Sequence, residues 1–273
     1  MQLINIARGR PLRVLQISDT HLYGDSGQLA GVDTEAAWQS VVNALCERGE
    51  RADLFLHTGD LIHDGAEDVE AAYYQAKRRL DVLRTPGLLV PGNHDDPRVM
   101  ERVFQTGPVR CTGHLIAGDW LFVMLDSTVP GATHGHLSPD QLQWLDDCLG
   151  ANSDRHTLVG LHHHPVAVGC GWIDRIGVDN GRELFRVLDR HEAVRAVVWG
   201  HVHQEFDDWY GDVRLLASPS TCVQFAPDSD AFRIDCRPSG YRWLDLRPDG
   251  TVRTGVERLT ELPAGLNAGL AGY

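Results

Sequence analysis

Residues 14–21 read Val-Leu-Gln-Ile-Ser-Asp-Thr-His, an apolar run followed at once by side chains that can bind a metal ion. The run at 14–17 is typical of a short buried strand. Asp19 and His21 are separated by one residue, so in an extended segment their side chains point the same way. The stretch therefore predicts a strand that delivers two metal ligands at its carboxyl end.

Four more strands are predicted to end in a similar way. They are the apolar runs at 54–56, 88–90, 158–161 and 196–199, which are followed by Gly59-Asp60, Gly92-Asn93-His94-Asp95, His162-His163-His164-Pro165 and Gly200-His201-Val202-His203. In open α/β sheets, ligands bind at the edge formed by the carboxyl ends of the strands. The placement of these histidines, aspartates and one asparagine predicts a single site at that edge.

The intervening regions predict helices and further strands. Helices are expected at 35–48, capped by Asp33 or Thr34, at 67–83, and from Ser138-Pro139 onward; another strand is expected at 121–125.

From residue 205 onward the pattern changes to antiparallel strands. Turn residues at 210–212 and 248–250 indicate two hairpins. The residues alone therefore predict one α/β domain over 1–262, whose sheet gains antiparallel strands late in the chain. The Gly/Ala-rich residues 263–273 are expected to form a C-terminal tail, either loose or docked.

The composition is that of an ordinary globular protein, with 42% hydrophobic and 23% charged residues in 273. A formal net charge of −13 argues against a protein that coats nucleic acid or an anionic membrane. Residues 1–13 lack the apolar core of a signal peptide, and no apolar run approaches the roughly 20 residues of a membrane span. The six cysteines form no C-x-x-C pair and are expected to be reduced thiols, which predicts a cytoplasmic protein.

Seven side chains are candidate metal ligands: Asp19, His21, Asp60, Asn93, one of the three consecutive histidines, His201 and His203. Seven ligands are too many for one zinc ion, which normally takes four. They suit two ions that share the carboxylate of Asp60, because a carboxylate has two oxygens. Two such ions would make the site positive enough to attract a phosphodiester. Ligands of this kind favour iron, manganese, zinc or cobalt.

These five blocks, in this order, resemble the signature of the calcineurin-like metallophosphoesterases. The similarity extends to the bacterial class III cyclic-AMP phosphodiesterases in the segments 15–22, 161–165 and 218–225, in overall length and in the terminal Gly272-Tyr273. The resemblance implies a four-layer α/β/β/α sandwich. It also implies a metal-dependent hydrolase whose substrate is a small cyclic nucleotide.

By position, the resemblance implies that one ion is held by Asp19, His21, Asp60 and His203, and the other by Asp60, Asn93, His163 and His201. His163 is preferred within its triple because the family pattern is His, any residue, Pro. His162 and His164 are expected to point the other way along a strand, as packing or supporting residues. The side chains expected to contact substrate are His21, Asp60, Asn93, His94 and His203.

His94 has no place among these ligands and is interpreted as the general acid that protonates the leaving oxygen. The implied nucleophile is a hydroxide bridging the two ions. Some relatives carry an acidic residue three positions after the bridging aspartate. Here that position is His63, with Asp64 next, which leaves open whether this loop supplies an orienting carboxylate.

The predicted activity is hydrolysis of 3′,5′-cyclic AMP to 5′-AMP, with iron or manganese as the expected metals. A phosphodiesterase of broad specificity, acting on glycerophosphodiesters or 2′,3′-cyclic nucleotides, is the alternative, because a metal site recognises only the phosphate. A non-catalytic scaffold is disfavoured, since every ligand is present. Residues 218–225 are the candidate cap around the nucleotide. The roles of His134, His136 and Asp126 and the oligomeric state stay open.

Overall fold

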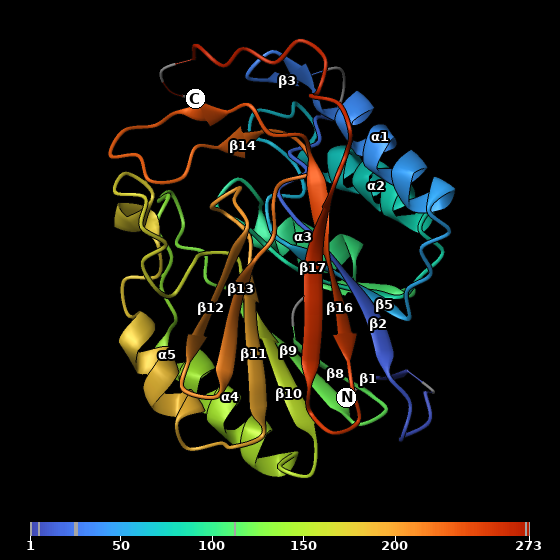
Figure 1. Cartoon of the computed structure of the whole chain (residues 1–273), viewed down its shortest axis with the longest axis vertical. Helices are drawn as coiled ribbons and strands as arrows, with labels where there is room; N and C mark the ends of the chain where they lie inside the picture. The colour runs from blue at the N-terminus through green and yellow to red at the C-terminus, as the bar shows by residue number, and fades with distance from the viewer. Residues whose placement is uncertain (1, 5, 25–26, 112, 271, 273) are drawn as a thin grey trace.

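A computed structural model describes residues 2–4, 6–24, 27–111, 113–270 and 272, and its strands form two large sheets (Figure 1). The first sheet holds six strands, in the spatial order β17 (Val252–Arg258), β16 (Gly240–Leu246), β2 (Leu12–Ile17), β5 (Leu54–Thr58), β6 (Gly87–Val90) and β7 (Val109–Cys111). Strands β2, β5, β6 and β7 run parallel, whereas β16 is antiparallel to both of its neighbours.

The second sheet holds seven strands, in the order β1 (Gln2–Ile4), β8 (Gly113–Ala117), β9 (Trp120–Met124), β10 (His156–Gly160), β11 (Val194–Trp199), β13 (Val213–Ala217) and β12 (Phe206–Tyr210). Its central strands β9, β10, β11 and β13 are parallel. Two small antiparallel pairs complete the strands: β3 (Gln28–Leu29) with β4 (Val32–Asp33), and β14 (Gln224–Phe225) with β15 (Ile234–Asp235).

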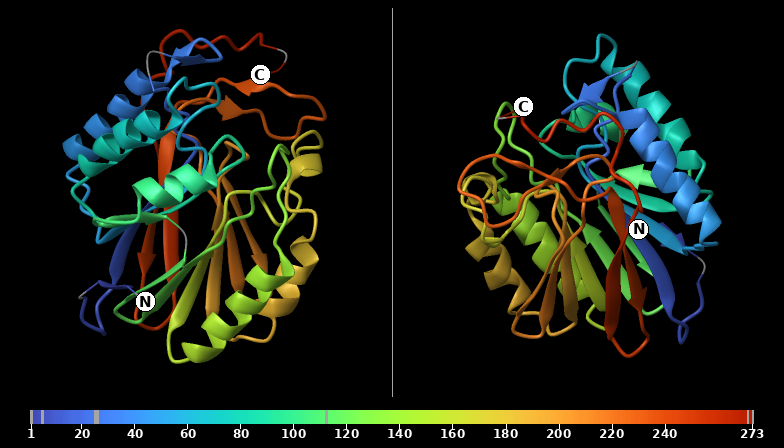
Figure 2. Two further views of the ribbon diagram at one scale, coloured as in Figure 1. Left: turned by 180° about the vertical axis from the view of Figure 1, so that it is seen from behind. Right: turned by 45° about the horizontal axis from the view of Figure 1, so that its top comes forward.

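Helices cover the outer face of each sheet, as both views of Figure 2 show. The first sheet carries α1 (Thr34–Glu47), α2 (Val69–Asp81) and α3 (Pro97–Val103), and the second carries α4 (Pro139–Ala151) and α5 (Gly181–Leu188). A short 3₁₀ helix lies at Asp174–Ile176. The layers follow the order helix, sheet, sheet, helix, so the four-layer α/β/β/α sandwich implied by the resemblance is confirmed.

The alternation of side chains along each strand explains why two sheets stack. In β5, Leu54 and Leu56 pack between the sheets, whereas Phe55 packs under the helices. Phe122 and Leu158 meet them from the second sheet. Both faces of the central strands are therefore apolar, which removes the hydrophobic–polar alternation that would mark a solvated face. The prediction of one sheet with late antiparallel strands is wrong, because these strands join two different sheets.

Local sequence signals predicted where α1 and α4 begin. The carboxylate of Asp33 accepts a hydrogen bond from the amide of Ala36 and caps α1, and Ser138 caps α4 through the amide of Gln141. Helix α2 is shorter than predicted. Both predicted hairpins are present, joining β12 to β13 and β16 to β17. Helices α3 and α5, which are both short, were not predicted.

Part of the C-terminal tail lies against the rest of the protein. The amide of Asn267 donates to the carbonyl of Ala30, and Leu266 and Leu270 pack on the core beside the second sheet. Tyr273 lies outside the described residues. The division at residue 262 stays a prediction. Among the residues described, none of the helices is long and apolar enough to cross a membrane.

Candidate metal centre

The polar segments that follow β2, β5, β6, β10 and β11 meet at one edge of the sandwich. Backbone hydrogen bonds tie them together, from the amide of Asp19 to the carbonyl of Gly59 at 3.0 Å and from Gly200 to His162 at 3.1 Å. Five site residues have a left-handed backbone, with φ between 45° and 65°: Asp19, His21, Asp60, His201 and His203. Non-glycine residues rarely adopt this conformation, and it concentrates at functional sites.

The first group of ligand atoms comes from Asp19, His21, Asp60 and His203, all buried. The Nε2 atoms of His21 and His203 lie 3.2 Å apart. Nε2 of His21 is 3.7 Å from Oδ2 of Asp60, and Nε2 of His203 is 3.4 Å from Oδ1 of Asp19. Two nitrogens and two carboxylates thus converge on one point, as the sequence predicted.

The second group also adjoins Asp60 and includes His162. Nε2 of His162 is 3.4 Å from Oδ2 of Asp60 and 3.2 Å from Oδ1 of Asn93. Its Nδ1 donates to the carbonyl of Thr58 at 2.7 Å. The expectation that His162 points away from the site is wrong. Strand β10 ends at Gly160, so the alternation of a strand no longer applies at this position.

His163, the residue preferred from the sequence, also lies beside this second group. Its ring is 4.6 Å from that of His201, and the imidazoles of His162, His163 and His201 can together hold an ion. Nδ1 of His163 pairs with Oγ of Ser127 at 2.8 Å, and Nε2 has no hydrogen-bond partner among the described residues. His164 lies 3.6 Å from Asp174 and packs against His201.

The site has the unsatisfied polar atoms expected of a cation site. Oδ2 of Asp19 and Nε2 of His201 are buried without a hydrogen-bond partner in the described part of the chain. Such atoms are costly to bury unless a ligand satisfies them. The Nε2 atoms of His21 and His203 face each other with room for one proton at most, and a cation bound to both would satisfy them. The residues present therefore fit a pair of metal ions, and the cluster is suited to a dinuclear site.

The electrostatics favour the metal-binding protonation states of His21, His201 and Asp60, but not that of His162. Burial lowers the pKa of His21 and His201 well below the usual range, which keeps both imidazoles neutral. Burial opposes ionisation of Asp60, but His162 and His94 hold its pKa well below the usual value. Burial also opposes the charge on His162, yet Asp60 raises its pKa to about 9. Metal binding requires neutral imidazole, so a cation would displace that proton.

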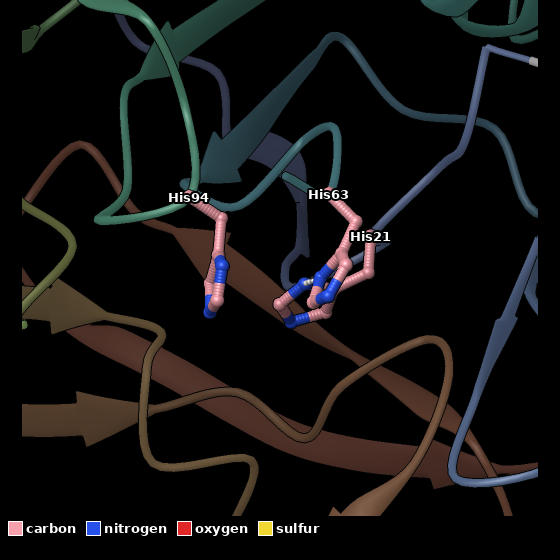
Figure 3. Close-up of side chains that lie close together, drawn as sticks. All are labelled: His21, His63 and His94. Atoms are coloured by element: carbon pink, nitrogen blue, oxygen red, sulfur yellow. Dashed lines mark hydrogen bonds between the residues drawn. The ribbon is translucent and has the colours of Figure 1, made fainter. Parts of the chain in front are cut away.

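His94 is held by the loop that follows Asp60. Its Nδ1 pairs with Oδ2 of Asp64 at 2.7 Å, and its amide donates to Oδ1 of Asp60 at 3.0 Å. Burial opposes protonation of His94, but Asp60 and Asp64 outweigh it and raise the pKa. Asp64 thus supplies the orienting carboxylate that the sequence left in doubt. Figure 3 shows His94 beside His63 and His21.

Two supporting residues were missed in the sequence. Asp95 accepts from the amides of Leu61, Ile62 and Gly92, and so fastens the loop of Asp60 to that of Asn93. Ser220 donates from Oγ to the carbonyl of Asp19 at 2.8 Å. Asp95 could have been proposed from the sequence, because it directly follows Asn93 and His94.

Residues 218–225, the candidate cap around the nucleotide, are buried, and the segment contacts His203 of the first group of ligands. The carbonyl of Val223 accepts from Nδ1 of His203 at 2.8 Å, and the ring of Phe225 stacks on that of His203 at 4.0 Å. The segment therefore orients His203, one of the candidate metal ligands.

The residues left open from the sequence lie around the second group. His136 is exposed and pairs with Asp179, at 2.6 Å. Asp126 accepts from the amide and hydroxyl of Thr128, which is a structural turn. Asp126 also lines a cavity of about 1150 Å³ that reaches Asn93. His134 is half-buried, and its role stays open.

Replacing Gly59 with Ala is expected to destabilise the protein, because the added methyl group would collide with His162. Gly59 has φ +96°, and a Cβ there would lie 2.2 Å from Nδ1 of His162. Strain and overpacking together should lower the free energy of unfolding of the metal-free protein by roughly 2–5 kcal/mol. Urea denaturation measures this effect. Gly49→Ala is the control, because Gly49 also has positive φ (+63°) but no atom within 4 Å of its added Cβ. Equal losses in both variants would mean that contact with His162 is unimportant.

The family described as calcineurin-like phosphoesterase matches residues 12–205, which hold all of the ligand-bearing segments. The chain belongs to the calcineurin-like phosphoesterase family. As a calcineurin-like phosphoesterase, it is a metal-dependent hydrolase, and the two groups of ligand atoms around Asp60 form its candidate dinuclear centre.

Relatives of this phosphoesterase include several named cyclic-nucleotide phosphodiesterases. The chain is 41% identical to the 3′,5′-cyclic adenosine monophosphate phosphodiesterase CpdA of Pseudomonas aeruginosa, over 95% of this chain and 94% of that protein. Identity to CpdA of Escherichia coli K12 is also 41%, covering 92% and 90%. A 3′,5′-cyclic-nucleotide phosphodiesterase of Nostoc is 38% identical, covering 91% and 93%.

Solved structures of lower identity share the fold. A dimetal phosphatase from Danio rerio superposes with a TM-score of 0.62 at 18% identity, covering 89% of this chain and 98% of that one. The purple acid phosphatase PPD1 of yellow lupin gives a TM-score of 0.62 at 12% identity, covering 93% and 55%.

Proposed function

We propose that this protein hydrolyses 3′,5′-cyclic AMP to 5′-AMP and so lowers the concentration of this second messenger. The observation that carries the proposal is the combination of a full set of ligands for two ions with relatives named cyclic-AMP phosphodiesterase along nearly the whole chain. The substrate is thus a small molecule with a single phosphodiester.

We assign one ion to Asp19, His21, Asp60 and His203, as the sequence suggested. For the other ion we choose Asp60, Asn93, His162 and His201, so that His162 replaces the His163 of the sequence-based assignment. The support is the short distance from Nε2 of His162 to both Asp60 and Asn93. A backbone carbonyl on the outer nitrogen, as at His162, is the usual way in which a metal-binding histidine is oriented.

When bound, two divalent ions would supply an activated water and neutralise charge on the phosphoryl group. His94 would donate a proton to the departing 3′ oxygen, with Asp64 holding its ring in place. The amide of Asn93 is placed to steady a phosphoryl oxygen. The side chains proposed to face the phosphate are His21, Asp60, Asn93, His94 and His203. Iron or manganese is the proposed native metal, with zinc or cobalt as alternatives.

The nucleoside would extend into the cavity that begins at Asn93. This cavity has about 1150 Å³ of space and contains both polar and apolar side chains, including Gln141 and Trp144. Trp144 is 36% exposed and offers an aromatic face for a base. The cavity therefore suits a ligand larger than a phosphate alone.

The proposal is tested by incubating metal-reconstituted protein with 3′,5′-cyclic AMP, 3′,5′-cyclic GMP, 2′,3′-cyclic AMP and a glycerophosphodiester. Products are resolved by chromatography, with metal-free protein and Asn93→Ala as controls. Preferential formation of 5′-AMP that disappears in both controls is the expected result. Faster turnover of another diester would favour the broad-specificity alternative, and no turnover with two metals bound would favour a scaffold.

The choice between His162 and His163 gives a direct prediction about metal content. His162→Ala should retain about one ion per chain after dialysis and lose affinity for the second by more than the roughly 10–100-fold that loss of a supporting residue costs, whereas His163→Ala should keep two. Mass spectrometry of dissolved metal, with the wild type dialysed in parallel, measures both. The reverse pattern would restore His163 as the ligand.

A cytoplasmic location is also proposed. All six cysteines are free thiols, including the exposed Cys46 and Cys236, and free exposed thiols are typical of a reducing compartment.

A further inference from the structure

His63 touches the first metal group from outside the set of ligands. Its Nδ1 lies 3.1 Å from Nδ1 of His21, and the two rings meet edge to face with centroids 5.2 Å apart (Figure 3). The opposite nitrogen of His21, Nε2, faces His203 and Asp60. His21 therefore has one nitrogen directed at the proposed ion and the other at His63.

With an ion bound to Nε2 of His21, this arrangement would determine the proton positions on both rings. When Nε2 of a neutral imidazole binds metal, the ring proton must be on Nδ1. In His21 that proton lies on the atom that faces His63, so Nδ1–H of His21 donates and Nδ1 of His63 accepts. His63 then carries its own proton on Nε2. This hydrogen bond to His63 would thus favour the tautomer of His21 that binds metal.

The partner of His21 differs from those of the other oriented histidines. His203 donates to the backbone carbonyl of Val223, and His162 donates to that of Thr58. Backbone carbonyls are fixed by the fold, whereas His63 is a side chain on the loop after β5. His63 is itself restrained, because its ring stacks on His94 at 4.6 Å and lies 5.0 Å from the ring of Tyr23.

We propose that His63 is a positioning residue for the first metal ion: its Nδ1 holds His21 in the orientation and tautomer that bind the ion. This inference rests on the proposed two-ion site and adds a residue to it. It predicts that the affinity of the first ion depends on His63, whereas the affinity of the second does not. It also predicts that an acceptor other than imidazole at position 63 can replace it.

The experiment measures binding of Mn²⁺ to the metal-free full chain by titration calorimetry, with paramagnetic resonance to detect the coupled ion pair. His63→Ala should weaken one of the two Mn²⁺ sites by about 10–100-fold, the usual effect of removing the partner of a metal-binding histidine. His63→Gln should recover part of the loss, because its amide oxygen can accept from His21. His191→Ala is the matched control, since this remote histidine pairs with Asp146 on α4.

Wild-type affinity at both sites in His63→Ala would overturn the proposal. Equal weakening of both sites, with a lower melting temperature of the metal-free variant, would also overturn it and indicate a structural role. Three Mn²⁺ ions in the wild type and two in His63→Ala would make His63 a ligand instead. Each readout is independent of cyclic AMP, so failure of the proposed substrate would leave this result interpretable.

Discussion

Asp60→Asn is expected to reduce kcat/KM for phosphodiester hydrolysis by roughly 10³-fold or more and to leave fewer than two ions bound per chain. Asp60 is the carboxylate that we propose both ions share, since its Oδ2 lies 3.7 Å from Nε2 of His21 and 3.4 Å from Nε2 of His162. Asn keeps the size of the side chain and can still accept from the amide of His94. The substitution therefore removes charge and bridging capacity while retaining shape.

The measurement pairs steady-state kinetics with metal content after dialysis. Asp146→Asn is the matched control, because Asp146 also pairs with an imidazole, that of His191, but lies on α4 away from the site. It should keep both ions and full activity. Two tightly bound ions in Asp60→Asn would contradict the assignment of Asp60 as the bridge.

Excess Mn²⁺ provides a second test of the same variant. Weak binding can be overcome by mass action, so part of the activity lost through poor occupancy should return at high concentration. The part that does not return reflects the missing negative charge between the ions.

Local sequence patterns identified most of the site because the fold brings strand ends together. Asp19, His21, Asp60 and His203 were predicted as one group, and the structure places them within reach of a single ion. The prediction needed only that parallel strands end at a common edge. It required no knowledge of which sheet each strand enters.

The same reasoning failed where the chain leaves its regular strands. His162 was expected to face away from the site by strand alternation, but β10 ends at Gly160 and the next residues follow a loop. Likewise, the left-handed backbone of Asp60 and His201 cannot be inferred from residues that seldom adopt it. Ligand identity in such loops depends on backbone angles that tertiary contacts impose.

The number of sheets could not be predicted from the residues alone, for a related reason. A strand buried on both faces is apolar throughout, and such a run does not reveal whether helices or a second sheet cover it. Leu56 faces the second sheet and Phe55 faces the helices, yet nothing in their chemistry distinguishes the two surroundings. The resemblance to a known family supplied this information.

His94→Ala is expected to lower kcat by roughly 10²–10⁴-fold, the usual contribution of a positioned general acid, while metal content stays near that of the wild type. Retention of the metal is expected because the backbone amide of His94 donates to Oδ1 of Asp60, and Ala keeps that amide. The loss of turnover follows from removing the proton donor that Asp64 orients.

Comparing substrates with different leaving groups distinguishes proton donation by His94 from a purely structural role. A diester with a p-nitrophenyl leaving group departs without a proton, so His94→Ala should affect its hydrolysis far less than that of cyclic AMP, whose 3′ alkoxide needs one. Asp64→Asn should cause a smaller loss, about 10–100-fold, with the same dependence on the leaving group. Equal losses for both substrates would exclude proton donation by His94, and a parallel loss of metal would make it a ligand. Only a proton donor gives a large effect that varies with the leaving group while both ions remain bound.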